Sequence, residues 1–200
     1  MKPIKIFSIL LMLCLGIATV ATAQPAAVKK AANTTFTLTT FDAKGSILST
    51  SNGVFVSNNG ICVSTWKPFV GAMKAEVTDN NGQKYSVETI LGANELYDVA
   101  KFKITAKTNA ALFAPSVVAN SAAWIVMPSQ AGAPIKANID KVEKFMTKYN
   151  YCVLSTTASE KYNGAPVLND KGQIVGIYNS NGTLQSATDA KYANDFVLTG

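Results

Sequence analysis

Short runs of β-branched and aromatic residues alternate with turn-forming residues along most of the chain. The runs lie at 35–39, 53–56, 61–64, 84–87 and 173–177. Turn signals that end in glycine separate them, at 42–45, 58–60, 80–82, 169–172 and 179–182. Short strands at such close spacing are typical of an all-β sandwich or barrel. The hydrophobic pattern therefore predicts an all-β fold.

Few segments have the apolar spacing of a helix. Residues 68–73 predict a short helical turn, and a C-terminal helix is predicted after Thr188, where Tyr192, Phe196 and Val197 recur near helical spacing. Residues 24–33 are rich in alanine and predict a flexible lead-in. Residues 106–120 predict a crossover between two β lobes.

The N-terminus has the pattern of a secretory signal. Lys2 and Lys5 precede an apolar run over 6–20, and Ala21-Thr22-Ala23 is a small-residue cleavage site. Cys14 follows Leu13, whereas a lipidation signal has a small residue before its cysteine. We therefore expect residues 1–23 to be removed before Gln24. The mature protein is expected to be exported, periplasmic or secreted, without a later membrane span.

The composition excludes several classes of function. The chain has no histidine, which excludes His-dependent hydrolases and His-ligated metal sites. All 18 of its basic residues are lysines, so it has no guanidinium clamp for phosphate. The formal charge of +6 falls to +4 once Lys2 and Lys5 are removed with the signal, and the remaining lysines are scattered. Nucleic acid is therefore not expected as a partner.

Three blocks, in order, resemble the trypsin-like serine proteases of the HtrA-like branch. They are GVFVSNNGICVSTWK at 53–67, YDVAKFKI at 97–104 and KYNGAPVLNDKGQIVGI at 161–177. In this resemblance Lys67 stands at the position of the catalytic histidine, Asp98 is the retained aspartate and Asn163 stands at the serine of a Gly-Asn-Ser-Gly-Gly-Pro pattern. Each residue also has an ordinary interpretation as a loop or turn residue, so the order of the blocks carries the resemblance.

The resemblance implies two antiparallel six-stranded β-barrels, the first over 34–106 and the second over 107–200, with a short C-terminal helix. It places Cys62 in the first barrel and Cys152 in the second. We therefore expect two buried thiols, with a disulfide as the alternative. Neither cysteine has a metal-type spacing, and no metal or cofactor is expected.

The replaced positions imply that catalysis is lost. An asparagine amide is not a nucleophile, and a lysine beside Asp98 would stay protonated and could not act as a base. The family has glycine where Lys161 stands, at a backbone N–H of the oxyanion hole. No catalytic residue is therefore expected at Lys67, Asp98 or Asn163.

The resemblance leaves three functions to compare. The leading hypothesis is an exported pseudoprotease that binds a protein or peptide, with Trp66, Lys161 and Tyr162 as candidate binding residues. The second is a noncanonical serine hydrolase in which Lys67 activates Ser155 or Ser159. The third is a purely structural secreted β domain.

Overall fold

The structure is a computed structural model, and it describes residues 23–95, 97–145, 149–180 and 186–188. In these residues the strands form two closed six-stranded barrels. The strands of the first barrel are β1 (Thr35–Phe41), β2 (Ile47–Phe55), β3 (Ile61–Ser64), β4 (Lys74–Asp79), β5 (Lys84–Asn94) and β6 (Val99–Ile104). Those of the second are β7 (Ser121–Ile125), β8 (Ile135–Phe145), β9 (Tyr149–Leu154), β10 (Pro166–Leu168), β11 (Ile174–Asn179) and β12 (Ser186–Thr188).

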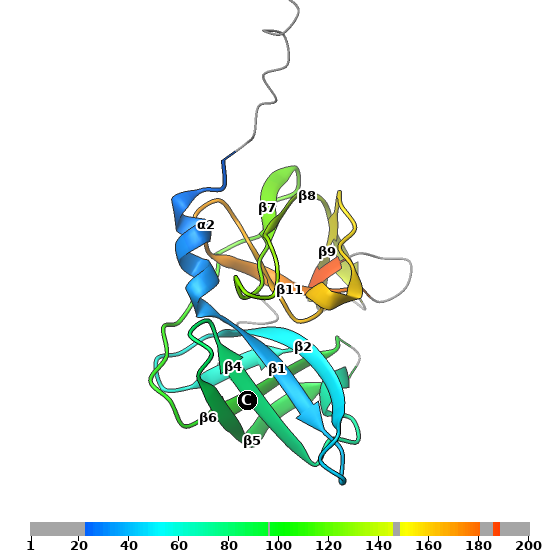
Figure 1. Cartoon of the computed structure of the whole chain (residues 1–200). Coiled ribbons are helices and arrows are strands. Elements are labelled where there is room, and N and C mark those ends of the chain that lie inside the picture. Colours follow the sequence, from blue (N-terminus) through cyan, green and yellow to red (C-terminus); the bar gives the residue numbers. More distant parts are fainter. Residues whose placement is uncertain (1–22, 96, 146–148, 181–185, 189–200) are drawn as a thin grey trace, which may run out of the picture.

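Both barrels have the same strand order. It is β1-β2-β3-β6-β5-β4 in the first and β7-β8-β9-β12-β11-β10 in the second, and each closes by pairing its two ends. All these pairings are antiparallel, and the barrels stack one above the other (Figure 1). The predicted fold of two antiparallel six-stranded barrels is therefore confirmed.

Three of the tight hairpin turns are built in the same way. Asp42, Asp79 and Asn169 each begin a turn, and the side-chain Oδ1 of each accepts two backbone N–H groups two and four residues later. The glycine three residues after each of them has a φ between 72° and 79°. This combination of a short polar side chain and glycine is the turn signal that the sequence carries.

Each barrel has its own apolar core, and a third cluster joins the two. Phe36, Phe55 and Phe102 pack together inside the first barrel. Ala, Ile and Val side chains together with Tyr162 and Tyr178 fill the second. The cluster between the barrels brings together Val28, Val54, Val63, Val99, Ala111, Trp124, Val126, Leu168, Ile174 and Ile177. Burial of these side chains fixes one barrel against the other.

The segment before β1 differs from its prediction. The lead-in expected over 24–33 contains the helix α2 (Ala26–Ala31), followed by the 3₁₀ turn η1 (Ala32–Thr34). Val28 of α2 is fully buried, and a Cβ on Gly172 would lie 2.6 Å from the carbonyl oxygen of Ala27. The helix therefore packs tightly on the second barrel, and a loose lead-in is the wrong description. The predicted C-terminal helix lies outside the described residues.

The two cysteines of the described residues lie in the barrel cores. Cys62 and Cys152 are both buried, in different barrels, and the two thiols are not joined in a disulfide, as predicted.

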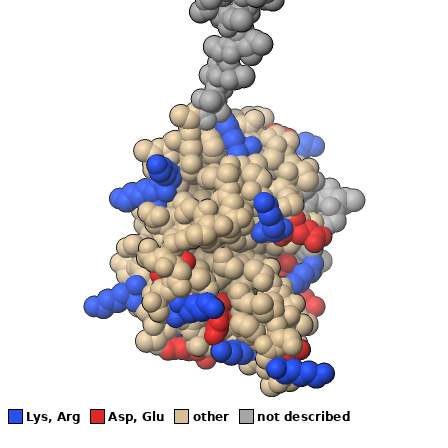
Figure 2. All heavy atoms as spheres, in the orientation of Figure 1, with Lys and Arg blue, Asp and Glu red and all other residues tan. Residues whose placement is uncertain are grey.

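Figure 2 shows lysine side chains separated from one another over most of one face, with acidic groups among them. No helix in the described part of the chain is both long and apolar enough to cross a membrane.

Candidate functional site

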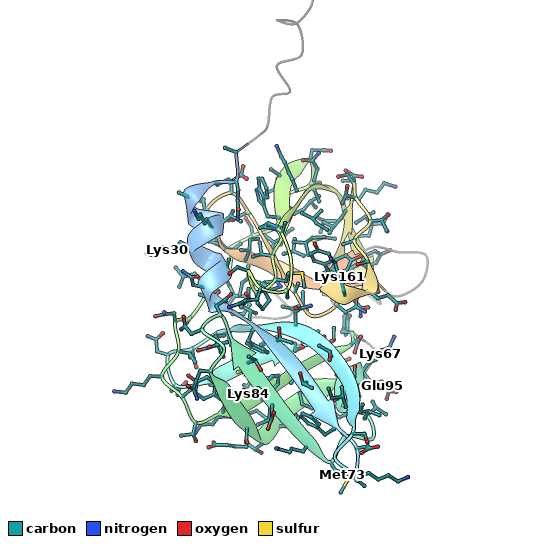
Figure 3. All side chains as sticks on the ribbon, in the orientation of Figure 1. Lys30, Lys67, Met73, Lys84, Glu95 and Lys161 are labelled. Carbon is teal, nitrogen blue, oxygen red and sulfur yellow. The ribbon has the colours of Figure 1, made fainter. Side chains whose placement is uncertain are left out.

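Lys67 begins the short 3₁₀ turn η2 (Lys67–Phe69), three residues after β3 ends at Ser64. Pro68 at the second position presets the backbone of this turn. The side chain of Lys67 is exposed. In Figure 3, Lys67 lies on the first barrel and Lys161 on the second, on the same side of the drawing beside the junction.

Asp98 lies immediately before β6 and is 5% exposed. Its Oδ1 accepts the backbone N–H groups of Trp66 (2.9 Å) and Lys67 (2.7 Å), and its Oδ2 accepts the side-chain amide of Asn179 (2.8 Å). Asn179 is the last residue of β11, so this carboxylate links the two barrels. Asp98 has φ 50°, a left-handed conformation that short polar residues tolerate better than most.

This geometry changes the expected relation between Lys67 and Asp98. The sequence predicts that the lysine ammonium lies beside the carboxylate. In the structure the backbone of Lys67 holds the carboxylate, and the ion pairs between described residues are Lys74–Glu76 and Lys141–Glu143. Asp98 therefore positions the loop after β3 through main-chain hydrogen bonds.

Asn163 joins the second barrel to the first. Its carbonyl oxygen accepts the N–H of Asn52 (2.9 Å) and the hydroxyl of Ser51 (2.9 Å), both on β2. Its side-chain Oδ1 accepts the N–H of Ser180 (2.7 Å). Gly164 follows with φ 80°, and a Cβ there would lie 2.0 Å from the carbonyl oxygen of Asn52. Only glycine fits this approach of the two backbones.

The three positions named by the resemblance are therefore brought together. The Asp98 carboxylate accepts hydrogen bonds from the Lys67 N–H and from the side-chain amide of Asn179. The neighbour of Asn179, Ser180, binds Asn163. The site draws on the loop after β3, the residue before β6, the end of β11 and the turn before β10. Asn179 and Ser180 were missed as site residues because the sequence marks them only as part of a turn signal.

The turn that carries Asn163 is closed on itself. Glu160–Tyr162 form the 3₁₀ turn η3, in which the Asn163 N–H donates to the carbonyl oxygen of Glu160 at 2.9 Å. The Tyr162 N–H donates to the carbonyl oxygen of Ser159, also at 2.9 Å. Both N–H groups are thus used within the turn, and the N–H of Asn163 is not left to bind an external oxyanion.

The three candidate binding residues occupy different environments. Tyr162 is 5% exposed, in the core of the second barrel, and its hydroxyl donates to the carbonyl oxygen of Ala133 at 3.0 Å. Its ring is therefore part of the core and leaves almost no surface for a ligand. Trp66 is half-buried and stacks on Phe69, with 6.0 Å between the ring centroids. Lys161 is exposed, and its Nζ lies 5.2 Å from the centre of the Tyr162 ring.

A second buried tyrosine supports the same turn. The hydroxyl of Tyr178 donates to the carbonyl oxygen of Ala158 (2.6 Å) and accepts the N–H of Ala158 (3.2 Å). Burial raises the pKa of Tyr178, and the hydrogen bond to Ala158 offsets part of this rise. The phenol therefore stays neutral and fixes the chain just before η3.

Ser155 and Ser159, the serines of the alternative hydrolase, are not hydrogen-bonded to Lys67 among the described residues. The Ser155 hydroxyl accepts the N–H of Asn138 (2.9 Å), between β8 and β9. Ser159 directly precedes η3. Among the hydrogen bonds between described residues, none joins the Lys67 ammonium to Ser155 or Ser159. The described residues also contain no group of three or more His, Cys, Asp or Glu side chains placed to hold a metal ion.

Comparison with known proteins agrees with the fold. The sequence matches no family model and no curated protein. Among solved structures, a serine endoprotease from Yersinia pestis matches with a TM-score of 0.74 and 18% identity, over 86% of this chain and 64% of that one. A serine-to-alanine variant of the HtrA-type protease AlgW, with a tripeptide, matches with a TM-score of 0.73 and 18% identity, over 86% and 62% of the two chains.

The present chain thus spans less than two thirds of the length of both proteases. At 18% identity the likeness concerns the fold alone. The chain has the double-barrel fold of the HtrA-like, trypsin-like serine proteases.

Proposed function

We propose that this protein is an exported, catalytically inactive homologue of the trypsin-like proteases that acts by binding a protein or peptide. The observation that carries the loss of catalysis is the environment of Asn163. Its amide oxygen is held by Ser180, and its N–H is bound to the carbonyl oxygen of Glu160. The position thus offers neither a nucleophile nor a donor for a developing oxyanion.

Retention of Asp98 without a histidine fits the same proposal. In a working triad the aspartate orients the imidazole. Here the carboxylate accepts three hydrogen bonds, from Trp66, Lys67 and Asn179. Its structural role in joining the two barrels is sufficient to explain why this side chain is needed.

An exposed apolar surface on the first barrel supports the binding part of the proposal. We call it the first-barrel apolar surface; its members are exposed to 67%, 45%, 59% and 75%, and they are Ile47, Leu48, Val70 and Met73. They adjoin one another: the Met73 N–H donates to the carbonyl oxygen of Phe41, which pairs with Ile47, and Leu48 lies beside Gly71. Adjoining exposed apolar side chains are a common feature of protein interaction sites.

A cavity extends this surface. A depression of about 280 Å³ between the start of β4 and the middle of β5 is lined by Met73 and by Ile90, itself 40% exposed. Met73 lies at the far end of the first barrel, on the same side of Figure 3 as Lys67. We infer that apolar side chains of a protein partner contact this surface.

The catalytic part is tested with a serine-directed fluorophosphonate and with casein as substrate. The unmodified protein is expected to give neither labelling nor hydrolysis, because loss of the nucleophile or the base costs several orders of magnitude in rate. The variant with Lys67→His, Asn163→Ser and Lys161→Gly is expected to be labelled at residue 163. Labelling of the unmodified protein at Ser155 or Ser159, abolished by Lys67→Ala, would establish the hydrolase instead.

The binding part is tested by site-specific crosslinking in the exported fraction. A photoreactive amino acid at position 73 is expected to give discrete adducts with a partner, and these should disappear when Leu48→Asp places a charge on the same surface. Position 84, at the start of β5 and exposed, is the matched control and should give none. Equal crosslinking from both positions would show that the first-barrel apolar surface is not the docking site.

A further inference from the structure

The segment that begins at Gln24 lies beside a cavity that is distinct from the candidate site. This cavity, of about 680 Å³, lies between the α2 region and the loop that joins β7 to β8. Gln24 lines one side, Met127 and Pro134 line the other, and Lys29 and Lys30 contribute to its walls. In Figure 3, Lys30 lies on the opposite side of the drawing from Lys67 and Lys161.

The position of Gln24 is set by the packing of α2. Val28 is fully buried, and the Ala27 backbone packs against Gly172 in the turn between β10 and β11. Gln24 precedes the first helical residue by two positions, so the docked helix holds it at the cavity. Figure 1 shows α2 lying along the second barrel and continuing directly into β1 of the first.

The side-chain amide of Gln24 is unsatisfied. Its Nε2 is buried without a hydrogen-bond partner, and it is the single side-chain nitrogen or oxygen of this kind in the part of the chain that the structure describes. A buried amide donor without a partner is unfavourable and needs an explanation. Two polar groups in the wall of the cavity are bound elsewhere: the Ser129 hydroxyl donates to the side-chain oxygen of Asn80, and the carbonyl oxygen of Ala133 accepts the Tyr162 hydroxyl.

The expected processing of the chain places a second group at the same point. Cleavage after Ala21-Thr22-Ala23 would make Gln24 the first residue of the mature protein. Attack of its new α-amino nitrogen on its own Cδ would close a five-membered ring. As an ammonium it would also add a positive charge near Lys29 and Lys30, which line the same cavity.

We propose that Gln24 becomes pyroglutamate after signal removal and that the neutral lactam lies in this cavity. The α-amino nitrogen attacks Cδ, a new amide bond forms, the Cδ–Nε2 bond breaks and Nε2 leaves as ammonia with the proton of the amine. The step is intramolecular and needs no oxidant or co-reactant. It removes both the unpartnered amide nitrogen and the α-ammonium charge. The inference rests on the export part of the proposed function alone.

Mass spectrometry of the exported protein tests the modification. The mature chain is expected to have the mass of residues 24–200 less one ammonia and to resist Edman degradation. The control Gln24→Asn retains a side-chain amide but cannot form the five-membered lactam, so it should keep its full mass and be open to sequencing. An intact Gln24 after prolonged incubation overturns cyclisation and leaves the proposed function standing, whereas a different N-terminus overturns the processing on which both rest.

The cavity itself is tested by hydrogen exchange of the lactam N–H. This N–H is expected to exchange with solvent at least about tenfold more slowly in the folded protein than in a free peptide of residues 24–31 that begins with pyroglutamate, because packed groups are protected from exchange. Equal rates for the folded protein and the peptide would show that the lactam is solvent-exposed and would overturn its assignment to the cavity.

Discussion

The two barrels share one strand order, yet they hold their halves of the candidate site in different ways. On the second barrel, Tyr162 lies inside the core and Gly164 contacts β2 so closely that no side chain fits. On the first barrel, Lys67 is exposed, and the loop that carries it is held by the carboxylate of Asp98. Packing fixes one half of the site, and a single charged group fixes the other.

Under the loss of catalysis that we propose, this difference explains how the two-barrel scaffold is retained. The second-barrel half is part of the core, so its backbone is retained as long as the barrel folds. The first-barrel half depends on Asp98, which is satisfied by N–H groups of the backbone and of Asn179. Neither half requires histidine or serine to keep its geometry. Substitutions that alter either the packing of the second-barrel half or the Asp98 carboxylate of the first-barrel half therefore test this difference between the barrels.

The largest effect is expected from Gly164→Ala. The new Cβ would lie 2.0 Å from the carbonyl oxygen of Asn52, at φ 80°. Strain and overpacking together should lower the free energy of unfolding by about 3 kcal/mol. Urea denaturation measures this loss.

The matched control is Gly82→Ala. Gly82 has φ 78°, but no atom lies within 4 Å of its Cβ position, so strain alone should cost about 1 kcal/mol. Equal losses for the two variants would mean that contact with β2 contributes nothing and that packing does not fix the second-barrel half.

The sequence predicted the parts of this molecule that depend on neighbouring residues. Asp42 and Asn169 with their glycines gave the turns, and the strand segments between them gave the barrels. Asn163 was identified as a site residue from its order relative to the other two blocks. Its contact with β2 was not visible, because that contact joins residues more than 100 positions apart.

The burial of Tyr162 and the formation of α2 have a common physical cause. Tyr162 lies in a turn segment, and its burial follows from the packing of its ring in the core of the second barrel. Helix α2 has six residues, too few to show a hydrophobic period, and packing against Gly172 stabilises it. In both cases tertiary contacts decided what local sequence could not.

A smaller effect is expected from Asp98→Asn. Asparagine adopts φ 50° readily, so the backbone should be unaffected. The charge-assisted bonds to Trp66 and Lys67 weaken, which should cost about 2 kcal/mol. Amide hydrogen exchange at residues 66 and 67 should accelerate, while exchange in η3 stays unchanged.

Asp140→Asn, at an exposed position on β8, is the control and should change neither quantity. Faster exchange throughout η3 in Asp98→Asn would contradict the comparison, because the carboxylate would then support both halves of the site.

The smallest expected effect is a pH dependence of the free energy of unfolding that arises from a buried thiol in the core of the first barrel. Burial raises the pKa of the Cys62 thiol in the first barrel, because the thiolate is poorly solvated there. The folded state therefore binds this proton more tightly than the unfolded state does. The stabilisation is complete below the unfolded pKa of about 8.5 and is lost as the pH rises above it, by up to about 1.4 kcal/mol per pH unit.

Cys62→Val should reduce this slope between about pH 8.5 and pH 10, as measured by urea unfolding at a series of pH values. The pKa of Tyr178 in the second barrel is also raised by burial, but an unfolded tyrosine ionises only near pH 10, so its contribution begins later. The buried Cys152 thiol of the second barrel is left in place, so the change in slope measures the contribution of the first core alone. A slope below pH 10 that is unchanged in Cys62→Val would assign the effect to other groups and remove the contribution of the first core.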